Sequence, residues 1–268
     1  MRIGSGPGFG RRTATVTARE QHGAYVVLRC QDPGDKPPNP GQFYMLSSAE
    51  RWGGGDGERP FLPRAFSVLR ARGRELHFLL EVVGPGTRRL AELEPGDELL
   101  LVGPLGNGFA AARDGREALL VGGGVGIAPL AIWQDRLDRV APPLLGFRDR
   151  VHADGASLLD GPMIATDDGS VGYHGLVTDL LEEELVARAE QFEIYACGPP
   201  AMLETVRAMC AERGVPAQLA LESGMACGFG ACFGCVVPTA HGYVRLCLEG
   251  PVLDAQMLPA AAIAGAGR

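Results

Sequence analysis

The segment Met225–Cys247 reads MACGFGACFGCVVPTAHGYVRLC, and it decides how the C-terminal part of the chain folds. It holds four of the seven cysteines, in the spacing C-x4-C-x2-C-x11-C. Three thiolates from one tight loop and a fourth from a distance are typical of a plant-type 2Fe–2S cluster. The glycines between the cysteines permit the backbone angles of a wrapping loop. The sequence therefore predicts a 2Fe–2S cluster bound by Cys227, Cys232, Cys235 and Cys247.

Structural zinc and disulfides are the alternatives for these cysteines. Structural zinc usually takes two separated short pairs of ligands, a pattern that three cysteines within nine residues fit poorly. Disulfides are rare in cytoplasmic proteins, and the N-terminal MRIGSGPGFGRR lacks the apolar core of a secretion signal. We therefore expect a cytoplasmic protein whose cysteines are thiols or metal ligands.

The chain has 268 residues, enough for about two domains and a small appendage. Residues 1–112 carry six short β-rich runs separated by turns, which predicts a small closed antiparallel barrel. Residues 113–216 alternate strand and helix patterns, which predicts an α/β domain with a parallel sheet. Residues 217–268 form a third unit, and a metal centre would help to hold so small a unit together. The expected fold class is thus multi-domain, β followed by α/β and a cluster domain.

Two segments of the middle region carry clear helical patterns. Ile127–Val140 is apolar at helical spacing, and Pro199–Arg213 opens with a proline in its first turn. Between them, His174–Glu190 is expected to bury one face. That face comprises Leu176, Val177, Leu180, Leu181, Leu185 and Val186.

Composition excludes several classes of function. The formal net charge is −7 and there is no basic block, so a nucleic acid partner is not expected. The uncharged apolar run Ala118–Trp133 contains glycines and a proline and is shorter than the ~20 residues of a membrane-spanning helix. Glycine accounts for 39 residues, and this excess is expected in loops that turn tightly or approach a ligand.

Two short motifs in the barrel region are suited to a phosphate group. Arg64-Ala65-Phe66-Ser67 begins a β-rich run, and Gly84-Pro85-Gly86-Thr87 opens a helical turn some 20 residues later. A guanidinium binds a pyrophosphate through two hydrogen bonds and a serine hydroxyl adds a third. Glycine and threonine before a helix are also a common cap. The order and spacing of the two motifs along one predicted barrel favour a cofactor site.

Two further motifs lie at strand ends of the α/β region. Gly122-Gly123-Gly124-Val125-Gly126 precedes an apolar helical segment, but Ile127 stands where the general dinucleotide fingerprint has its third glycine. Cys197-Gly198-Pro199 follows a later strand, and the alternative for Cys197 is a buried thiol that fills space. Arg148 and Arg150 are suited to a 2′-phosphate or to plain solvation, so the residues leave NAD and NADP both open.

These motifs, together with Gly103–Phe109 (GPLGNGF), resemble the FAD domain of the ferredoxin–NADP reductase superfamily. With the C-terminal cysteine cluster, the chain resembles the electron transfer subunits of class B, NAD-dependent dihydroorotate dehydrogenases from about residue 12 to about 258. That family usually has proline where Ala65 stands. The resemblance implies FAD contacts from Arg64, Ala65, Phe66, Ser67, Leu79, Leu80, Glu81, Gly86 and Thr87. It implies an NAD site at Gly122, Gly123, Gly124, Gly126, Gly198 and Pro199, with Cys197 as a catalytic residue beside the nicotinamide.

The resemblance implies an oxidoreductase subunit of pyrimidine biosynthesis. A separate FMN-containing catalytic subunit would oxidise dihydroorotate, and electrons would pass through the 2Fe–2S cluster and FAD to NAD⁺, in a heterotetramer that docks near Met225–Phe233. The same layout occurs in flavin/2Fe–2S small subunits of NADH-dependent ferredoxin:NADP oxidoreductases and of sulfhydrogenases. A hypothesis of a different class is a non-catalytic binding module stabilised by zinc, which would hold no flavin.

Overall fold

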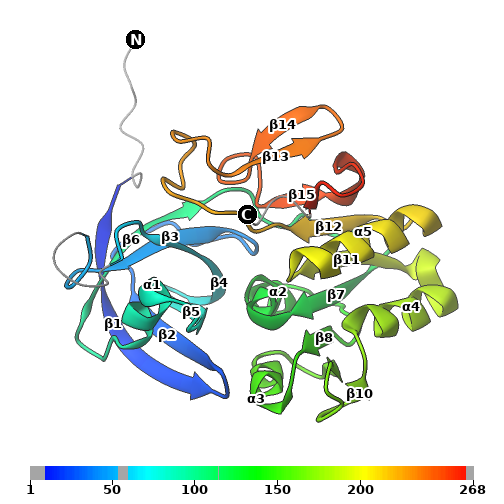
Figure 1. Ribbon diagram of the computed structural model, residues 1–268, viewed down its shortest axis with the longest axis horizontal. Helices are drawn as coiled ribbons and strands as arrows, with labels where there is room; N and C mark the ends of the chain where they lie inside the picture. The colour runs from blue at the N-terminus through cyan, green and yellow to red at the C-terminus, as the bar shows by residue number, and fades with distance from the viewer. Residues whose placement is uncertain (1–9, 54–59, 114, 264–268) are drawn as a thin grey trace.

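The computed structural model describes residues 10–53, 60–113 and 115–263. Its N-terminal part is a closed barrel with strand order β1-β2-β5-β4-β3-β6, blue to green at the left of Figure 1. Every neighbouring pair is antiparallel, so the predicted six-stranded antiparallel barrel is confirmed. The strands are β1 (Arg12–His22), β2 (Tyr25–Gln31), β3 (Phe43–Ser48), β4 (Arg64–Arg72), β5 (Glu75–Glu81) and β6 (Glu98–Leu105). The short helix α1 (Pro85–Ala91) connects β5 to β6.

The barrel is held by alternating side chains that meet inside it. Leu28, Tyr44, Phe78 and Leu80 belong to one buried cluster, while outward positions of β1 remain exposed or half-buried. Closure leaves no free sheet edge at the barrel wall. The rigid wall therefore presents the ends of β4 and β5 to the rest of the molecule.

The second part is a seven-stranded sheet in the order β10-β9-β8-β7-β11-β12-β15. All neighbours are parallel except β15, which runs antiparallel to β12. The predicted parallel-sheet α/β fold is thus confirmed. The strands are β7 (Glu117–Gly123), β8 (Leu144–Phe147), β9 (Met163–Thr166), β10 (Tyr173–His174), β11 (Phe192–Cys197), β12 (Ala217–Ala220) and β15 (Val252–Asp254).

Helices cover both faces of this sheet (Figure 1). α2 (Ile127–Gln134) lies between the sheet and β4 of the barrel and is buried along its whole length. It ends at Gln134, well before the predicted Val140. α4 (Val177–Arg188) and α5 (Pro200–Arg213) pack together on the other face, and the short α3 (Arg150–Ala153) follows β8. Single 3₁₀ turns occupy Gly124–Gly126, Asp154–Leu158, Ala189–Gln191 and Ala255–Met257.

The predicted buried face of the α4 segment is correct in its centre and wrong at both ends. Four of its leucine and valine side chains are buried, but Leu176 and Val186 are 57% and 73% exposed. Leu176 precedes the first helical turn as its cap residue. Val186 follows the buried Leu185 by one residue, which rotates it about 100° away from the sheet.

The C-terminal residues do not fold apart from the sheet. β12 and β15 are strands of the α/β sheet, although both lie in the range predicted as the third unit. Between them stand the cysteine loop and the two-stranded hairpin of β13 (Val236–Thr239) and β14 (Gly242–Arg245), drawn in orange in Figure 1. The loop is therefore anchored by a sheet strand on each side. The division at residues 112 and 216 stays a prediction.

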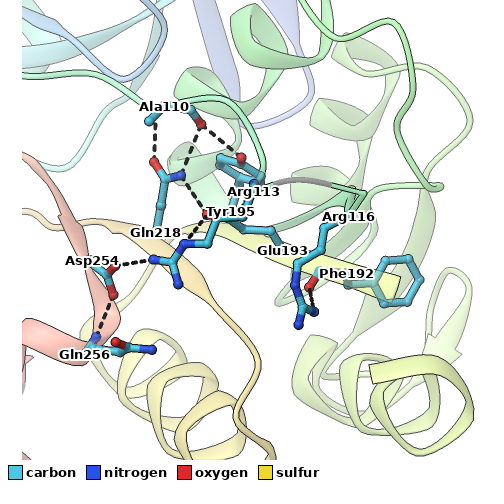
Figure 2. A network of polar contacts seen from close by, with 9 residues as sticks. All are labelled: Ala110, Arg113, Arg116, Phe192, Glu193, Tyr195, Gln218, Asp254 and Gln256. Atoms are coloured by element: carbon cyan, nitrogen blue, oxygen red, sulfur yellow. Dashed lines mark hydrogen bonds and ion pairs between the residues drawn. The ribbon is translucent and has the colours of Figure 1, made fainter. Parts of the chain in front are cut away.

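A buried carboxylate ties the linker between the two large parts to this sheet (Figure 2). Glu193 on β11 is 1% exposed. It accepts hydrogen bonds from the Arg113 backbone N–H at 2.7 Å and from Gln218 Nε2 at 2.9 Å. The Arg113 guanidinium also pairs with Asp254 on β15. This brace holds β11, β12 and β15 in register with the linker.

Candidate cofactor and cluster sites

A cleft of about 440 Å³ lies where the barrel, the start of α2 and the segment before the cysteine loop meet. The barrel lines it with Arg64, Ala65, Phe66, Ser67, Leu79, Glu81 and Thr87. The opposite side is lined by Val125, Ala128, Leu221, Glu222, Ser223, Gly224 and Met225. Most of the residues expected to contact FAD thus share one cleft.

The Arg64 guanidinium is fixed at one end of this cleft. Its Nη1 donates to the Leu62 carbonyl at 2.6 Å. A Cβ on Gly86 would lie 2.6 Å from Arg64 Nε, so the glycine lets the guanidinium pack against this turn without shifting. Thr87 Oγ1 accepts from the backbone N–H groups of Val83 and Gly84 at 2.9 and 3.1 Å, which fixes the turn. A fixed cation beside Ser67 is suited to a pyrophosphate, so these residues fit an FAD.

Two of the expected FAD contacts have other surroundings. Leu80 points into the barrel core, which leaves only its backbone available to a ligand. Glu81 pairs with Arg148, across to the α/β part, and lies 3.5 Å from His152 Nε2. Glu81 therefore joins the two parts at the edge of both clefts.

A second cleft, of about 450 Å³, opens over the carboxyl ends of the parallel strands. Three of the residues that the family resemblance implies for an NAD site line it: Gly123, Gly124 and Pro199. Its other lining residues are Tyr25, Glu81, Gly146, Phe147, Arg148, His152, Asp167, Leu176, Val177, Thr178, Ala201, Met202 and Thr205. Ligands of open α/β sheets bind at this edge.

The glycine-rich loop at residues 122–126 and the loop at residues 197–199 touch each other at their remaining glycines. A Cβ on Gly126 would lie 2.4 Å from the Cys197 carbonyl oxygen, and one on Gly198 would lie 3.0 Å from the Gly123 nitrogen. Gly122 packs beneath them on Leu130 and Leu145. The glycines therefore allow the two loops to meet backbone to backbone.

Cys197 lies at the end of β11, 1% exposed, and lines neither cleft. Burial raises its pKa well above the usual range, and the nearby Glu222 carboxylate raises it further. The thiol therefore remains protonated. Sequence reasoning missed Glu222, whose exposed side chain lines the first cleft.

The four clustered cysteines lie together as two pairs. Cys227 hydrogen-bonds with Cys232, and Cys235 with Cys247. Burial alone would raise the pKa of Cys227, but hydrogen bonds from nearby backbone N–H groups and from Cys232 lower it to about 7. Burial and the neighbouring Cys235 raise the pKa of Cys247 to about 12. Backbone N–H groups also point at sulfur, from Gly234 to Cys232 at 3.4 Å and from Cys247 to Cys235 at 3.5 Å.

This donor set fits a two-iron cluster. Four thiols in two pairs, with N–H groups directed at sulfur, suit a cluster whose irons each take two cysteines. Gly228, with φ of +78°, lets the loop pack on Met45, and Gly230, with φ of +85°, lets it pack on Leu248.

The loop carries apolar side chains outward next to the cluster cysteines. Phe229 and Phe233 are 45% and 63% exposed, and Cys232 is exposed between them. The Arg245 guanidinium lies 4.9 Å from the centroid of the Phe233 ring. The cluster site is thus at the surface, under an aromatic and cationic rim.

Comparison with known proteins gives a consistent family. Residues 222–259 match the iron–sulfur cluster binding domain of dihydroorotate dehydrogenase B. A dihydroorotate dehydrogenase B (NAD(+)) electron transfer subunit of Clostridium acetobutylicum is 36% identical over 229 residues, 84% of this chain and 88% of that one. A probable subunit of this name from Methanopyrus kandleri is 35% identical over 260 residues, 94% of this chain and 93% of that one.

Solved structures are similar at the level of the fold. The NADH-dependent reduced ferredoxin-NADP oxidoreductase matches with a TM-score of 0.78 at 24% identity, over 94% of this chain and 92% of that one. A ferredoxin NADP⁺ reductase from Neisseria gonorrhoeae matches with a TM-score of 0.61 at 18% identity, over 76% and 92%. Helices with the length and hydropathy of a membrane span are absent from residues 10–53, 60–113 and 115–263.

Proposed function

The chain belongs to the family of dihydroorotate dehydrogenase B (NAD(+)) electron transfer subunits, and on that premise we propose the route that its electrons take. Dihydroorotate is oxidised on a partner catalytic subunit that holds FMN. Electrons then enter this chain at a 2Fe–2S cluster and leave it through FAD to NAD⁺. The family match overturns the hypothesis of a zinc-stabilised binding module, because the matched domain is an iron–sulfur one.

One observation carries this proposal: a single cleft borders the barrel, the α/β part and the segment that leads into the cysteine loop. It is lined by the barrel residues Arg64 and Ser67, by Val125 of the glycine-rich loop, and by Gly224 and Met225, which lead into Cys227. A cofactor in this cleft touches the nucleotide side and the cluster side together. Such contact is what a carrier between a dinucleotide and a cluster needs.

FAD, when bound, exchanges two electrons as a hydride with NAD(H) and single electrons with an iron–sulfur cluster. The chain's residues hold it for both partners. Arg64 and Ser67 would bind the pyrophosphate, and Phe66 and Leu79, which line the cleft, would exclude water from it. Leu80 acts through its backbone, since its side chain fills the barrel.

The second cleft is the site we assign to NAD⁺. Gly123 and Gly124 approach the pyrophosphate at the start of α2, and Gly198 and Pro199 form the facing loop. Cys197 lines neither cleft, and we propose that its buried, protonated thiol supports the facing loop from the end of β11 without covalent chemistry on the nicotinamide. The Arg148 and Arg150 side chains are engaged, by Glu81 and by the Ser170 carbonyl, which supports NAD over NADP.

The rim of the cluster loop is the surface we propose for the partner. Phe229 and Phe233 present apolar area around the exposed Cys232. Aromatic side chains with an arginine are typical of the centres of protein interfaces. The assembly is proposed to be a heterotetramer with the FMN-containing catalytic subunit, in the cytoplasm, where thiols stay reduced.

Cys232→Ser tests the division of labour in the reconstituted complex. We expect NADH to reduce the flavin at the wild-type rate while electron transfer from dihydroorotate to NAD⁺ is lost. Cys210→Ala is the matched control, because Cys210 is a buried free cysteine of α5, and both activities should survive. The proposal fails if a folded, FAD-loaded Cys232→Ser protein keeps full dihydroorotate-dependent NAD⁺ reduction.

Metal and partner analysis separates the remaining candidates. About two irons and about two acid-labile sulfides for each flavin support the proposal, whereas zinc without flavin contradicts it. Co-purification of a β/α-barrel partner holding FMN supports dihydroorotate as the electron source. A partner with several 4Fe–4S clusters would contradict that source while leaving the flavin chemistry in place.

A further inference from the structure

Tyr25 is a barrel residue whose hydroxyl has been left without a partner inside the nucleotide cleft. The residue is fully buried at the start of β2. Its Oη makes no hydrogen bond with any of the described residues. Tyr25 nevertheless lines the second cleft together with Gly123, Gly124 and Pro199. A buried hydroxyl without a partner is costly in the free protein.

The surroundings of the ring fix where this hydroxyl points. The ring stands edge-on to His152, with 5.7 Å between centroids, and a Cβ on Gly155 would lie 2.8 Å from its Cε2. The hydroxyl end faces the glycine-rich loop, since a Cβ on Gly124 would lie 3.9 Å from Tyr25 Oη. The ring thus packs between His152 of α3 and Gly155 of the 3₁₀ turn that follows it.

The charges nearby explain why a neutral donor is suited to this place. Glu81 and Arg148 are paired with each other at the edge of the cleft, and His152 is held by Asp149 at 2.7 Å. The groups around the hydroxyl are thus already partnered. An incoming anionic oxygen at Gly124 would meet the phenol O–H as a free donor.

We propose that Tyr25 Oη donates a hydrogen bond to the pyrophosphate of the bound pyridine dinucleotide. The barrel thereby contributes a hydrogen-bond donor to a site built mostly from the α/β part. This inference rests on the assignment of the second cleft to NAD(H). It deepens that assignment, because it makes dinucleotide binding depend on the docking of the β1–β2 hairpin, where the Ala24 N–H donates to the Val151 carbonyl at 3.0 Å.

Tyr25→Phe removes the hydroxyl and keeps the ring. We expect the Kd of the FAD-loaded chain for NADH, measured by calorimetry, to rise roughly tenfold or more, as for a hydrogen bond to a charged group. ADP-ribose, which carries the pyrophosphate, should lose the same factor. Adenosine, which has no phosphate, should bind both proteins equally. Tyr44→Phe is the control, since Tyr44 is equally buried in the barrel but lines neither cleft.

The outcomes separate this inference from the function on which it rests. If the wild-type chain binds neither NADH nor ADP-ribose, the assignment of the cleft is wrong. If it binds both and Tyr25→Phe binds them with unchanged affinity, the Tyr25 inference alone is overturned. Thermal unfolding gives an independent readout: the wild type should gain more stability from ADP-ribose than Tyr25→Phe does, and equal gains would overturn the inference as well.

Discussion

Gly228 is the point at which the cluster loop rests on the barrel, and its replacement by alanine tests that contact. Its φ of +78° is left-handed, which costs a residue with a side chain about 1–2 kcal/mol. A Cβ at this position would lie 2.5 Å from Met45 Cγ and 3.1 Å from Leu105 Cδ1. Displacing buried side chains costs roughly 1–3 kcal/mol. We therefore expect Gly228→Ala to lower the free energy of unfolding by about 2–5 kcal/mol.

Gly214→Ala separates the backbone part of this loss from the contact. Gly214 ends α5 with φ of +65°, and a Cβ there would meet nothing within 4 Å. Only the conformational cost of about 1–2 kcal/mol then applies. Denaturant titration of the holoprotein, followed by cluster absorbance and flavin fluorescence, should show Gly228→Ala releasing iron at the lower denaturant concentration. Equal losses in the two variants, within about 0.5 kcal/mol, would refute the packing argument.

Three further perturbations test other parts of the structure. Glu193→Ala removes the acceptor of the buried Gln218 amide and of the Arg113 backbone N–H, so denaturation should show a loss of about 1–3 kcal/mol. The exposed Glu183→Ala should cost under about 0.5 kcal/mol, and similar losses would exclude a structural role for the brace. Burial lowers the pKa of His77 despite its hydrogen bond to Glu75. The neutral His77 imidazole therefore stabilises the folded protein above the unfolded pKa of about 6.5, and this stabilisation is lost as the pH falls through the lower folded pKa. His77→Gln should therefore flatten the fall in melting temperature between pH 7.5 and 5, and an unchanged slope would rule this out. Arg64→Lys keeps the charge but loses the planar fork, so FAD should bind roughly tenfold more weakly by flavin-release titration; undiminished binding would argue against a pyrophosphate contact.

Local spacing predicted much of the cluster site because its ligands lie in one short stretch. Three of the four cysteines fall within nine residues, so the chain can bring them together whatever the rest of the fold does. Cys247 follows at a distance, and its place depends on the β13–β14 hairpin returning to Cys235.

The rest of the site depends on contacts that the sequence does not display. Tyr25 stands in a barrel strand, and nothing near it in sequence indicates that its hydroxyl faces Gly124. Glu222 reaches the cleft because β12 joins the α/β sheet just before it. Leu80 was expected to contact a cofactor, but alternation along β5 turns its side chain into the barrel. In each case the tertiary arrangement decides which neighbour a side chain meets.

An anaerobic reductive titration of the purified chain tests the central claim most directly. A two-electron flavin and a one-electron cluster on the same polypeptide predict an uptake of about three electrons per chain. The cluster should then give an electron paramagnetic resonance signal that Cys232→Ser abolishes while two-electron bleaching of the flavin remains. Uptake of only about two electrons by an iron-replete preparation, with no such signal, would contradict the account.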